Sequence, residues 1–304
     1  MAALVLPLAY AGGAALAVAA GDRISKRFAG PGVAAEGLPG RAHAEETRQV
    51  ADSSQTGQPS AADPEVAGGG RKRIVIYGAG GGTGLALVQA ALQRGYLVRA
   101  FVRNASRFAR ELGATSAHGG LEVVEGDLAA DLEAVEAAVV GAEAVISVAG
   151  AKPETAPAPM AAAMPAIVAG CRKHGVRKLV VQACALSAVP GERWGWLTQG
   201  RLTRAIVRWQ LGSTVVDDNE RVIQYLHRDV RDLNWVVSRP AFLEDGDRTG
   251  TPVPCLDPFR SAAIAYVDLA DWTLAQVDSD EYVGKMPRGE GGGEGGTLSF
   301  HRLR

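Results

Sequence analysis

Three glycines at intervals of three residues, Gly78, Gly81 and Gly84, lie between a β-branched segment and an apolar segment with helical periodicity. Glycine at these positions permits a tight turn, close approach of the backbone to a ligand, and close packing of the helix on the strand. The N–H groups and the dipole at the start of such a helix favour an anion. The spacing therefore predicts a loop that binds the pyrophosphate of a dinucleotide.

The residues after the next expected strand, at 96–102, indicate which dinucleotide binds. An acidic residue there would accept hydrogen bonds from the adenosine ribose hydroxyls of NAD, but the chain has Arg103, Asn104, Ser106 and Arg107. A guanidinium can bind a 2′-phosphate through two parallel hydrogen bonds. We therefore predict NADP rather than NAD as the cofactor, the alternative being that Arg103 is a solvated side chain at the start of a helix.

An alternation of strands and helices is needed to position these residues. It predicts an α/β fold, a doubly wound and mostly parallel Rossmann sheet, with its ligand at the carboxyl ends of the strands. The six expected strands lie near residues 72–77, 96–102, 121–125, 143–148, 177–183 and 233–238.

The composition limits the classes of function. A chain of 304 residues with 47% apolar and 21% charged residues can form one large domain with appendages. The net charge of -1 disfavours a nucleic-acid-binding protein. The three cysteines show no C-x-x-C spacing, so neither a disulfide framework nor a metal site is predicted.

The N-terminal residues 1–21 carry no charged side chain and are followed by Asp22, Arg23, Lys26 and Arg27. This apolar length is just enough to span a bilayer, and the basic flank would place the globular domain in the cytoplasm, mitochondrial matrix or chloroplast stroma. We predict a retained membrane anchor. The alternatives are a cleaved signal, which would leave a soluble protein, and a buried helix.

Three further ranges complete the expected domain organisation. Residues 22–70 are rich in Gly, Ala and Pro and predict a linker, residues 71–286 form the NAD(P)-binding Rossmann domain, and residues 287–304 are expected to be a Gly-rich flexible tail.

A basic amphipathic segment, 194–209, lies where a substrate lid is expected. Helical spacing places Arg201, Arg204 and Arg208 on one face, and apolar side chains on another. The segment is either a helix packed on its own domain with a solvated arginine face, or a docking surface for an anionic membrane or a partner protein. Together with residues 1–70 it is the expected contact with a membrane complex.

Several short motifs in order resemble the atypical short-chain dehydrogenase/reductase superfamily, in particular the NmrA-like proteins and the flavin reductase/biliverdin-IX-beta reductase group. The likeness covers roughly residues 72–286. Besides the glycine loop, the motifs are Leu97-Val98-Arg99-Ala100-Phe101-Val102-Arg103, Gly126-Asp127-Leu128, Asp217-Asp218-Asn219-Glu220-Arg221, Trp235-Val236-Val237-Ser238-Arg239-Pro240 and Tyr266-Val267-Asp268-Leu269-Ala270.

The resemblance implies a role for individual residues in binding NADP. It implies that Arg103 contacts the 2′-phosphate, that Asp127 lies at the adenine amino group, and that Ala149 and Gly150 lie beside the nicotinamide ribose. The residues that it implies on the pyrophosphate are Gly78, Gly80, Gly81, Gly82 and Thr83, which are followed by Gly84 at the helix start.

The catalytic residues of the resembled superfamily are missing. Its classical and extended members protonate the substrate with a Tyr-x-x-x-Lys pair, and no such pair follows the expected fifth strand here. Cys184 stands where the flavin-reductase relatives carry serine, and Ser187 follows three residues later. Both are candidate proton donors, although a thiol at a strand end is more often a small buried apolar group.

Two functions remain open at this point. The first is an NADPH-dependent reductase of a planar conjugated substrate, such as a flavin, a quinone or a tetrapyrrole-like molecule. The second is a catalytically idle, nucleotide-binding accessory subunit or assembly factor of a respiratory or photosynthetic membrane complex. The glycine loop and Arg103 are compatible with both.

Overall fold

The computed structural model describes residues 71–150, 158–185, 187–190, 213–240, 242–250, 253–255, 263–283 and 297–301. The expected anchor at 1–21, the linker at 22–70 and the basic segment at 194–209 lie outside these residues and stay predictions. Within the described ranges, no helix combines the length and the apolar character needed to cross a membrane.

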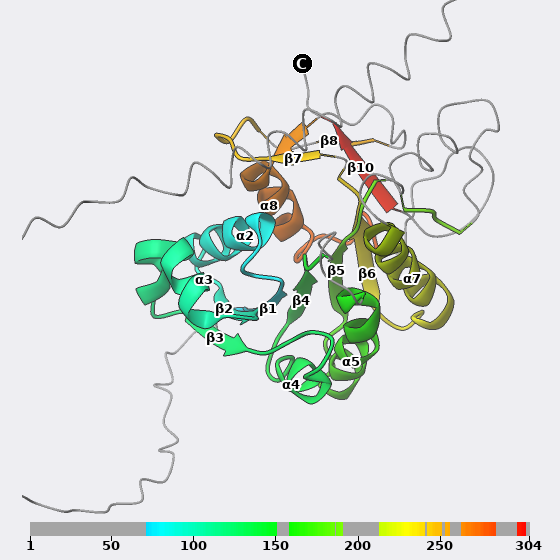
Figure 1. Ribbon diagram of the computed structural model, residues 1–304, viewed down its shortest axis with the longest axis horizontal. Coiled ribbons are helices and arrows are strands. Elements are labelled where there is room, and N and C mark those ends of the chain that lie inside the picture. Colours follow the sequence, from blue (N-terminus) through cyan, green and yellow to red (C-terminus); the bar gives the residue numbers. More distant parts are fainter. Residues whose placement is uncertain are drawn as a thin grey trace, which may run out of the picture. The chain divides into compact units, whose positions relative to one another are not determined.

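Six parallel strands form the centre of the structure, as predicted (Figure 1). In chain order they are β1 (Arg73–Tyr77), β2 (Leu97–Val102), β3 (Leu121–Glu125), β4 (Ala144–Ser147), β5 (Lys178–Gln182) and β6 (Asn234–Ser238). Their order in the sheet is β3-β2-β1-β4-β5-β6, and all neighbouring pairs are parallel. The order reverses between β1 and β4, which is where a doubly wound sheet binds its ligand.

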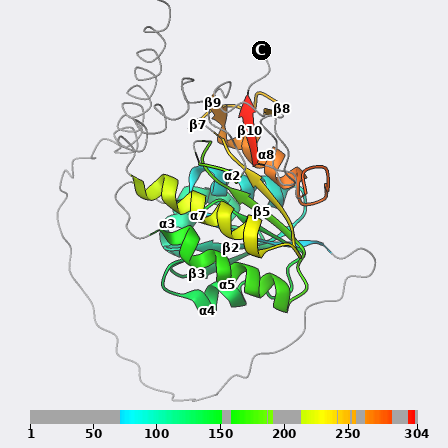
Figure 2. The same ribbon diagram turned by 90° about the vertical axis from the view of Figure 1, so that its right-hand side faces the viewer.

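Helices cover both faces of this sheet (Figures 1 and 2). One face carries α2 (Gly82–Gln93), α3 (Ala105–Leu112) and α8 (Tyr266–Ala275), and the other carries α4 (Leu132–Ala137), α5 (Pro159–Lys173) and α7 (Ser213–Asp229). A short 3-10 helix, η1 (Gly113–Ala117), follows α3.

The two cores follow from the alternation of side chains along each strand. In β1, Ile74 and Ile76 are buried against the helices of the first face, whereas Val75 and Tyr77 are buried against those of the second. A strand that is apolar on both sides is typical of a parallel sheet covered by two helical layers. The β-branched sequence of β1 therefore places the glycine loop at the end of a rigid central strand.

Strands beyond β6 extend the sheet. β10 (Thr297–His301) pairs in parallel with β6, and β8 (Val253–Cys255) pairs in antiparallel fashion with β10. β7 (Phe242–Glu244) and β9 (Ala263–Ala265) form a separate parallel pair. We expected residues 287–304 to be a flexible tail, but residues 297–301 form β10, because the edge of β6 offers unpaired backbone groups to a β-prone segment.

Candidate functional site

The turn after β1 requires glycine for two separate steric reasons. Gly78 has a φ of 79°, and a Cβ there would lie 2.5 Å from the backbone nitrogen of Ala149. At Gly84, a Cβ would lie 2.2 Å from the carbonyl oxygen of Gly78. The first glycine therefore permits the turn beside β4, and the second lets α2 start in direct contact with β1.

The start of α2 has backbone N–H groups without an acceptor in the helix. Gly81 precedes the helix, its N–H donates to the oxygen of Gly78 at 3.1 Å, and the first helical bond runs from Leu85 N to Gly81 O at 2.8 Å. The N–H groups of Gly82 and Thr83 lie in the first turn, where a helix supplies no acceptor of its own. Gly80, Gly81 and Gly82 are exposed and Thr83 is buried, so the residues present fit a pyrophosphate.

Arg103 lies immediately after β2, on the strand next to the glycine loop. A Cβ at Gly80 would lie 3.9 Å from Cγ1 of Val102, so the loop and the end of β2 are close neighbours. Arg107 pairs with Glu111 at 2.8 Å, whereas Arg103 is exposed and has no ion-pair partner in the described part of the chain. The expected 2′-phosphate contact of Arg103 stays a prediction that this position allows.

Asn104, next to Arg103, has a structural role that we did not predict. Its Oδ1 accepts a hydrogen bond from the N–H of Arg107 at 2.7 Å and so caps α3. The cap orients the segment that contains Arg103.

Asp127 lies after β3, and its side chain accepts hydrogen bonds within the turn to which it belongs. Its Oδ1 accepts hydrogen bonds from the N–H groups of Ala129 at 2.7 Å and Ala130 at 3.2 Å, and its own N–H donates to Oδ2 of Asp131 at 2.7 Å. The side chain is exposed. The side chain therefore shapes the turn before α4, and its contact with adenine stays a prediction.

Ala149 and Gly150 follow β4 and complete the carboxyl edge. Ala149 is packed against Gly78, while Gly150 is exposed, with open space where a Cβ would stand. The structure therefore brings the glycine loop and Ala149 together at the reversal of strand order. Gly150 presents no side chain to a ring placed beside it.

The two candidate proton donors differ in exposure. Ser187 is fully buried, and its Oγ has no hydrogen-bond partner among the residues that the structure describes. Its N–H donates to the oxygen of Cys184 at 3.0 Å, and its carbonyl oxygen accepts from Nη1 of Arg239 at 2.7 Å. Cys184 is partly exposed. Ser187 is therefore not accessible to a substrate in this structure, whereas Cys184 is.

The acidic motif at 217–220 holds elements together. Asp218 is 1% exposed, and its two oxygens accept from the N–H groups of Ala161 at 2.7 Å and Met160 at 3.2 Å. Burial raises the pKa of Asp218, although these two backbone donors oppose the rise. Glu220 accepts from the N–H of Ala188 at 2.9 Å, next to Ser187. The motif thus positions α5 and the segment after β5.

Tyr266 is a site residue that sequence reasoning missed as such. It is the first residue of α8, which lies beside α2. A Cβ at Gly82 would lie 2.6 Å from Cζ of Tyr266, so the ring packs directly on the glycine loop (Figure 1 shows the two helices). Burial, followed by the negative charge of Asp245, raises the pKa of this phenol. In the sequence, the signal for this residue is an aromatic side chain at the start of the motif Tyr266-Val267-Asp268-Leu269-Ala270.

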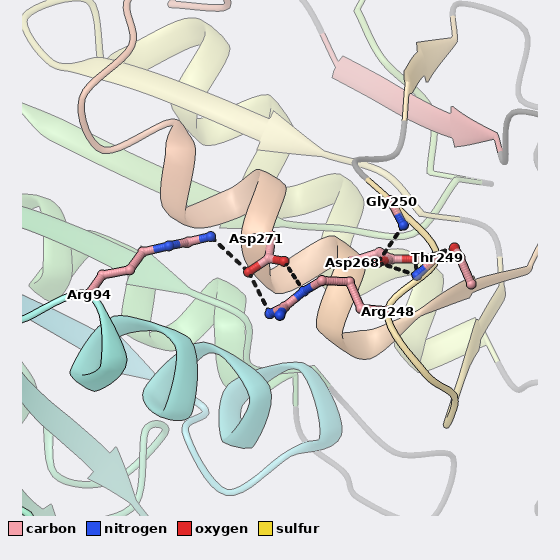
Figure 3. Close-up of polar contacts among 6 residues, drawn as sticks. All are labelled: Arg94, Arg248, Thr249, Gly250, Asp268 and Asp271. Carbon is pink, nitrogen blue, oxygen red and sulfur yellow. Dashed lines mark hydrogen bonds and ion pairs between the residues drawn. The ribbon is translucent and has the colours of Figure 1, made fainter.

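Two aspartates of α8 hold the segment that follows β7 (Figure 3). Asp268 is buried and accepts from the N–H groups of Thr249 at 3.0 Å and Gly250 at 3.3 Å. Asp271, one turn further along, pairs with Arg94 at the end of α2 and with Arg248. Together they fix residues 248–250 to the helix that begins with Tyr266.

Comparison with known proteins agrees with this geometry. The model of a family described as NAD(P)H-binding matches residues 78–280.

Solved structures share the fold. The chain is similar to the oxidoreductase ylbE from Lactococcus lactis, with 17% identity, a TM-score of 0.59 and coverage of 76% of this chain and 91% of that one. It is similar to a short-chain dehydrogenase/reductase from Veillonella parvula in complex with NADP (16%, TM-score 0.54, 76% and 94%). It is also similar to ChuY, an anaerobilin reductase from Escherichia coli O157:H7 (20%, TM-score 0.55, 76% and 97%).

Proposed function

Because the chain belongs to the NAD(P)H-binding family, we propose that it binds NADPH and reduces a planar conjugated substrate such as a flavin, a quinone or a tetrapyrrole-like molecule. The observation that carries the proposal is the exposed start of α2, with three glycines and free N–H groups, next to a β2 end that offers Arg103 instead of an acid. When bound, NADPH supplies a hydride from its nicotinamide ring.

The chain's own residues would act mainly by binding and orientation. The first turn of α2 would hold the pyrophosphate, Arg103 the 2′-phosphate, and Ala149 and Gly150 would lie beside the nicotinamide ribose. The single methyl group of Ala149 and the absence of a side chain at Gly150 would leave room for a flat acceptor on the nicotinamide. The proton that completes the reduction would come from water, Cys184 or Ser187.

A conjugated substrate is supported by two considerations. No Tyr-x-x-x-Lys pair follows β5 in the sequence, and a conjugated acceptor spreads the incoming charge and therefore depends less on a strong acid. One protein of the same fold is an anaerobilin reductase. Both considerations support the proposed substrate class.

The burial of Ser187 favours a second candidate, a nucleotide-binding accessory subunit or assembly factor of a respiratory or photosynthetic membrane complex. In this role, NADPH would stabilise the folded chain by about 3 kcal/mol at a hundredfold excess over its dissociation constant. Residues 1–21 would anchor the chain, and residues 1–70 and 194–209 would contact its partners. Cleavage of residues 1–21 would instead leave a soluble protein.

Calorimetric titration with NADPH and NADH, followed by NADPH-oxidation assays, tests the proposal. The acceptors are FMN, a short-chain quinone and biliverdin, each measured with and without the protein. Tight NADPH binding with protein-dependent oxidation supports the reductase. Binding without turnover on any acceptor supports the accessory subunit, and absence of NADPH binding contradicts both.

The proposed membrane location has its own test. The full chain and a chain starting at residue 22 are expressed as fusions, and membranes are washed with alkaline carbonate. We expect the full chain to stay in the pellet and the shorter chain to be released. Release of both would contradict an anchor in residues 1–21.

A further inference from the structure

The ring of Tyr266 lies at the N-terminal end of α2. In a helix, the Cα–Cβ bond tilts toward the N-terminus, so the Cβ position of Gly82, the first residue of α2, leans toward the end of the helix where the proposed phosphate would lie. At that position a Cβ would come within 2.6 Å of Cζ and 2.8 Å of Cε1 and Cε2 of Tyr266. The hydroxyl-bearing end of the ring therefore borders the space where the N–H groups of α2 point.

Contacts of neighbouring residues fix the position of Tyr266. Ala265, the preceding residue, pairs with Glu244 in the small β7-β9 sheet. Asp268, less than one turn later, accepts hydrogen bonds from the backbone N–H groups of Thr249 and Gly250 (Figure 3). Both contacts fix the start of α8. A side chain on such a rigid element can orient a ligand with little loss of entropy on binding.

The hydroxyl of Tyr266 is available as a donor. It has no hydrogen-bond partner in the described part of the chain, and the residue is partly exposed. Burial and the charge of Asp245 both raise the pKa of the phenol, so it keeps its proton at neutral pH. A protonated phenol donates a hydrogen bond to a phosphate oxygen. The negatively charged carboxylate of Asp245, by contrast, would repel the phosphate.

We propose that Tyr266 is a cofactor-contacting residue, whose ring covers the dinucleotide pyrophosphate at the start of α2 and whose hydroxyl donates a hydrogen bond to a phosphate oxygen. The pyrophosphate is then held from two helices, by backbone N–H groups of α2 and by a side chain of α8. This inference rests on the NADPH binding proposed above.

The test is calorimetric titration of the full chain with NADPH and with ADP-ribose 2′-phosphate, which keeps the pyrophosphate but lacks nicotinamide. Tyr266→Phe removes only the hydroxyl and Tyr266→Ala removes the ring. We expect Tyr266→Phe to raise the dissociation constants of both ligands about tenfold, which is the effect of losing one hydrogen bond to a charged group. Tyr266→Ala should raise them further. Thermal unfolding of the unliganded proteins is recorded alongside.

Tyr96→Phe is the matched control. The hydroxyl of Tyr96 donates to Oδ2 of Asp278 at 2.7 Å, just before β2 and thus at the opposite edge of the sheet. We expect this variant to keep the dissociation constants of the wild type. Because Tyr266→Phe keeps the ring packed on Gly82, it remains informative where Tyr266→Ala lowers stability.

The outcomes separate this inference from the proposed function. A wild type that does not bind NADPH would contradict the proposed function. A wild type that binds, with folded Tyr266→Phe and Tyr266→Ala variants of unchanged affinity, would overturn the role of Tyr266. An effect on NADPH that disappears with ADP-ribose 2′-phosphate would also overturn it, because the contact would then be to the nicotinamide half.

Discussion

Asp218, in the interior of α7, accepts a hydrogen bond at 2.7 Å from the backbone N–H of Ala161, in the first turn of α5. Its other oxygen accepts from Met160. The residue before α5, Ala158, has no side-chain acceptor, so the helix receives its N-terminal cap from a neighbouring helix. This contact couples the two helices on one face of the sheet.

Replacing Asp218 by alanine should therefore destabilise the protein. One buried and one partly buried N–H group would lose their acceptor, and we expect the free energy of unfolding to fall by about 2–4 kcal/mol. Urea unfolding followed by circular dichroism measures the change. Gln224→Ala, on the exposed side of the same helix, should stay within about 0.5 kcal/mol of the wild type. Equal stability of the two variants would contradict the capping role.

Arg103 should determine the preference for NADPH over NADH. We expect Arg103→Ala to raise the dissociation constant of NADPH about tenfold to a hundredfold, because a charge-assisted contact with the 2′-phosphate is lost, and to leave that of NADH unchanged. Calorimetry with both nucleotides provides the measurement. Arg110→Ala, an exposed arginine in the last turn of α3, is the control. Equal weakening of both nucleotides would show that Arg103 does not read the 2′-phosphate.

A negative charge at the start of α2 should abolish binding without unfolding the chain. A Cβ at Gly81 would lie 3.5 Å from its nearest contact, so Gly81→Asp has room for its side chain, but its carboxylate would repel a pyrophosphate. We expect NADPH affinity to fall at least a hundredfold, with an unchanged midpoint of thermal unfolding for the unliganded protein. Gly119→Asp, at an exposed glycine with open space around it, should bind as the wild type does. Normal NADPH binding by Gly81→Asp would place the phosphate elsewhere.

The pair of Arg172 and Asp232 should contribute to the acid sensitivity of stability. The hydrogen bond from Arg172 lowers the pKa of Asp232 from 3.8 to about 2. Since the folded-state pKa is the lower one, the stabilisation is complete above the unfolded value of 3.8 and is lost as the pH falls through about 2. Both side chains are about half exposed, so the contribution is small.

Urea midpoints measured between pH 5 and pH 2 test this effect. The wild type should lose stability more steeply than Asp232→Asn across the interval, because the variant has no carboxylate to protonate. Parallel slopes for the two proteins would mean that Asp232 titrates with an ordinary pKa in the folded state.

Sequence patterns with short-range causes could be interpreted directly. The β-branched runs predicted the six parallel strands, and the glycine spacing predicted a tight turn with close packing between helix and strand, which Gly78 and Gly84 show. Each of these features follows from local backbone geometry, which neighbouring residues dictate. The candidate proton donors were harder to assess, since the burial of Ser187 depends on segments far from it in the chain.

The amino-acid sequence by itself determined the doubly wound sheet and the place of the glycine turn, because alternation of apolar residues and the conformational freedom of glycine act over a few residues. Only the tertiary structure decided that Asp218 caps α5, that residues 297–301 add a strand beside β6, and that Tyr266 packs on Gly82. These contacts join residues from 57 to well over a hundred positions apart in the chain. They depend on how helices and strands pack together, which no local pattern encodes.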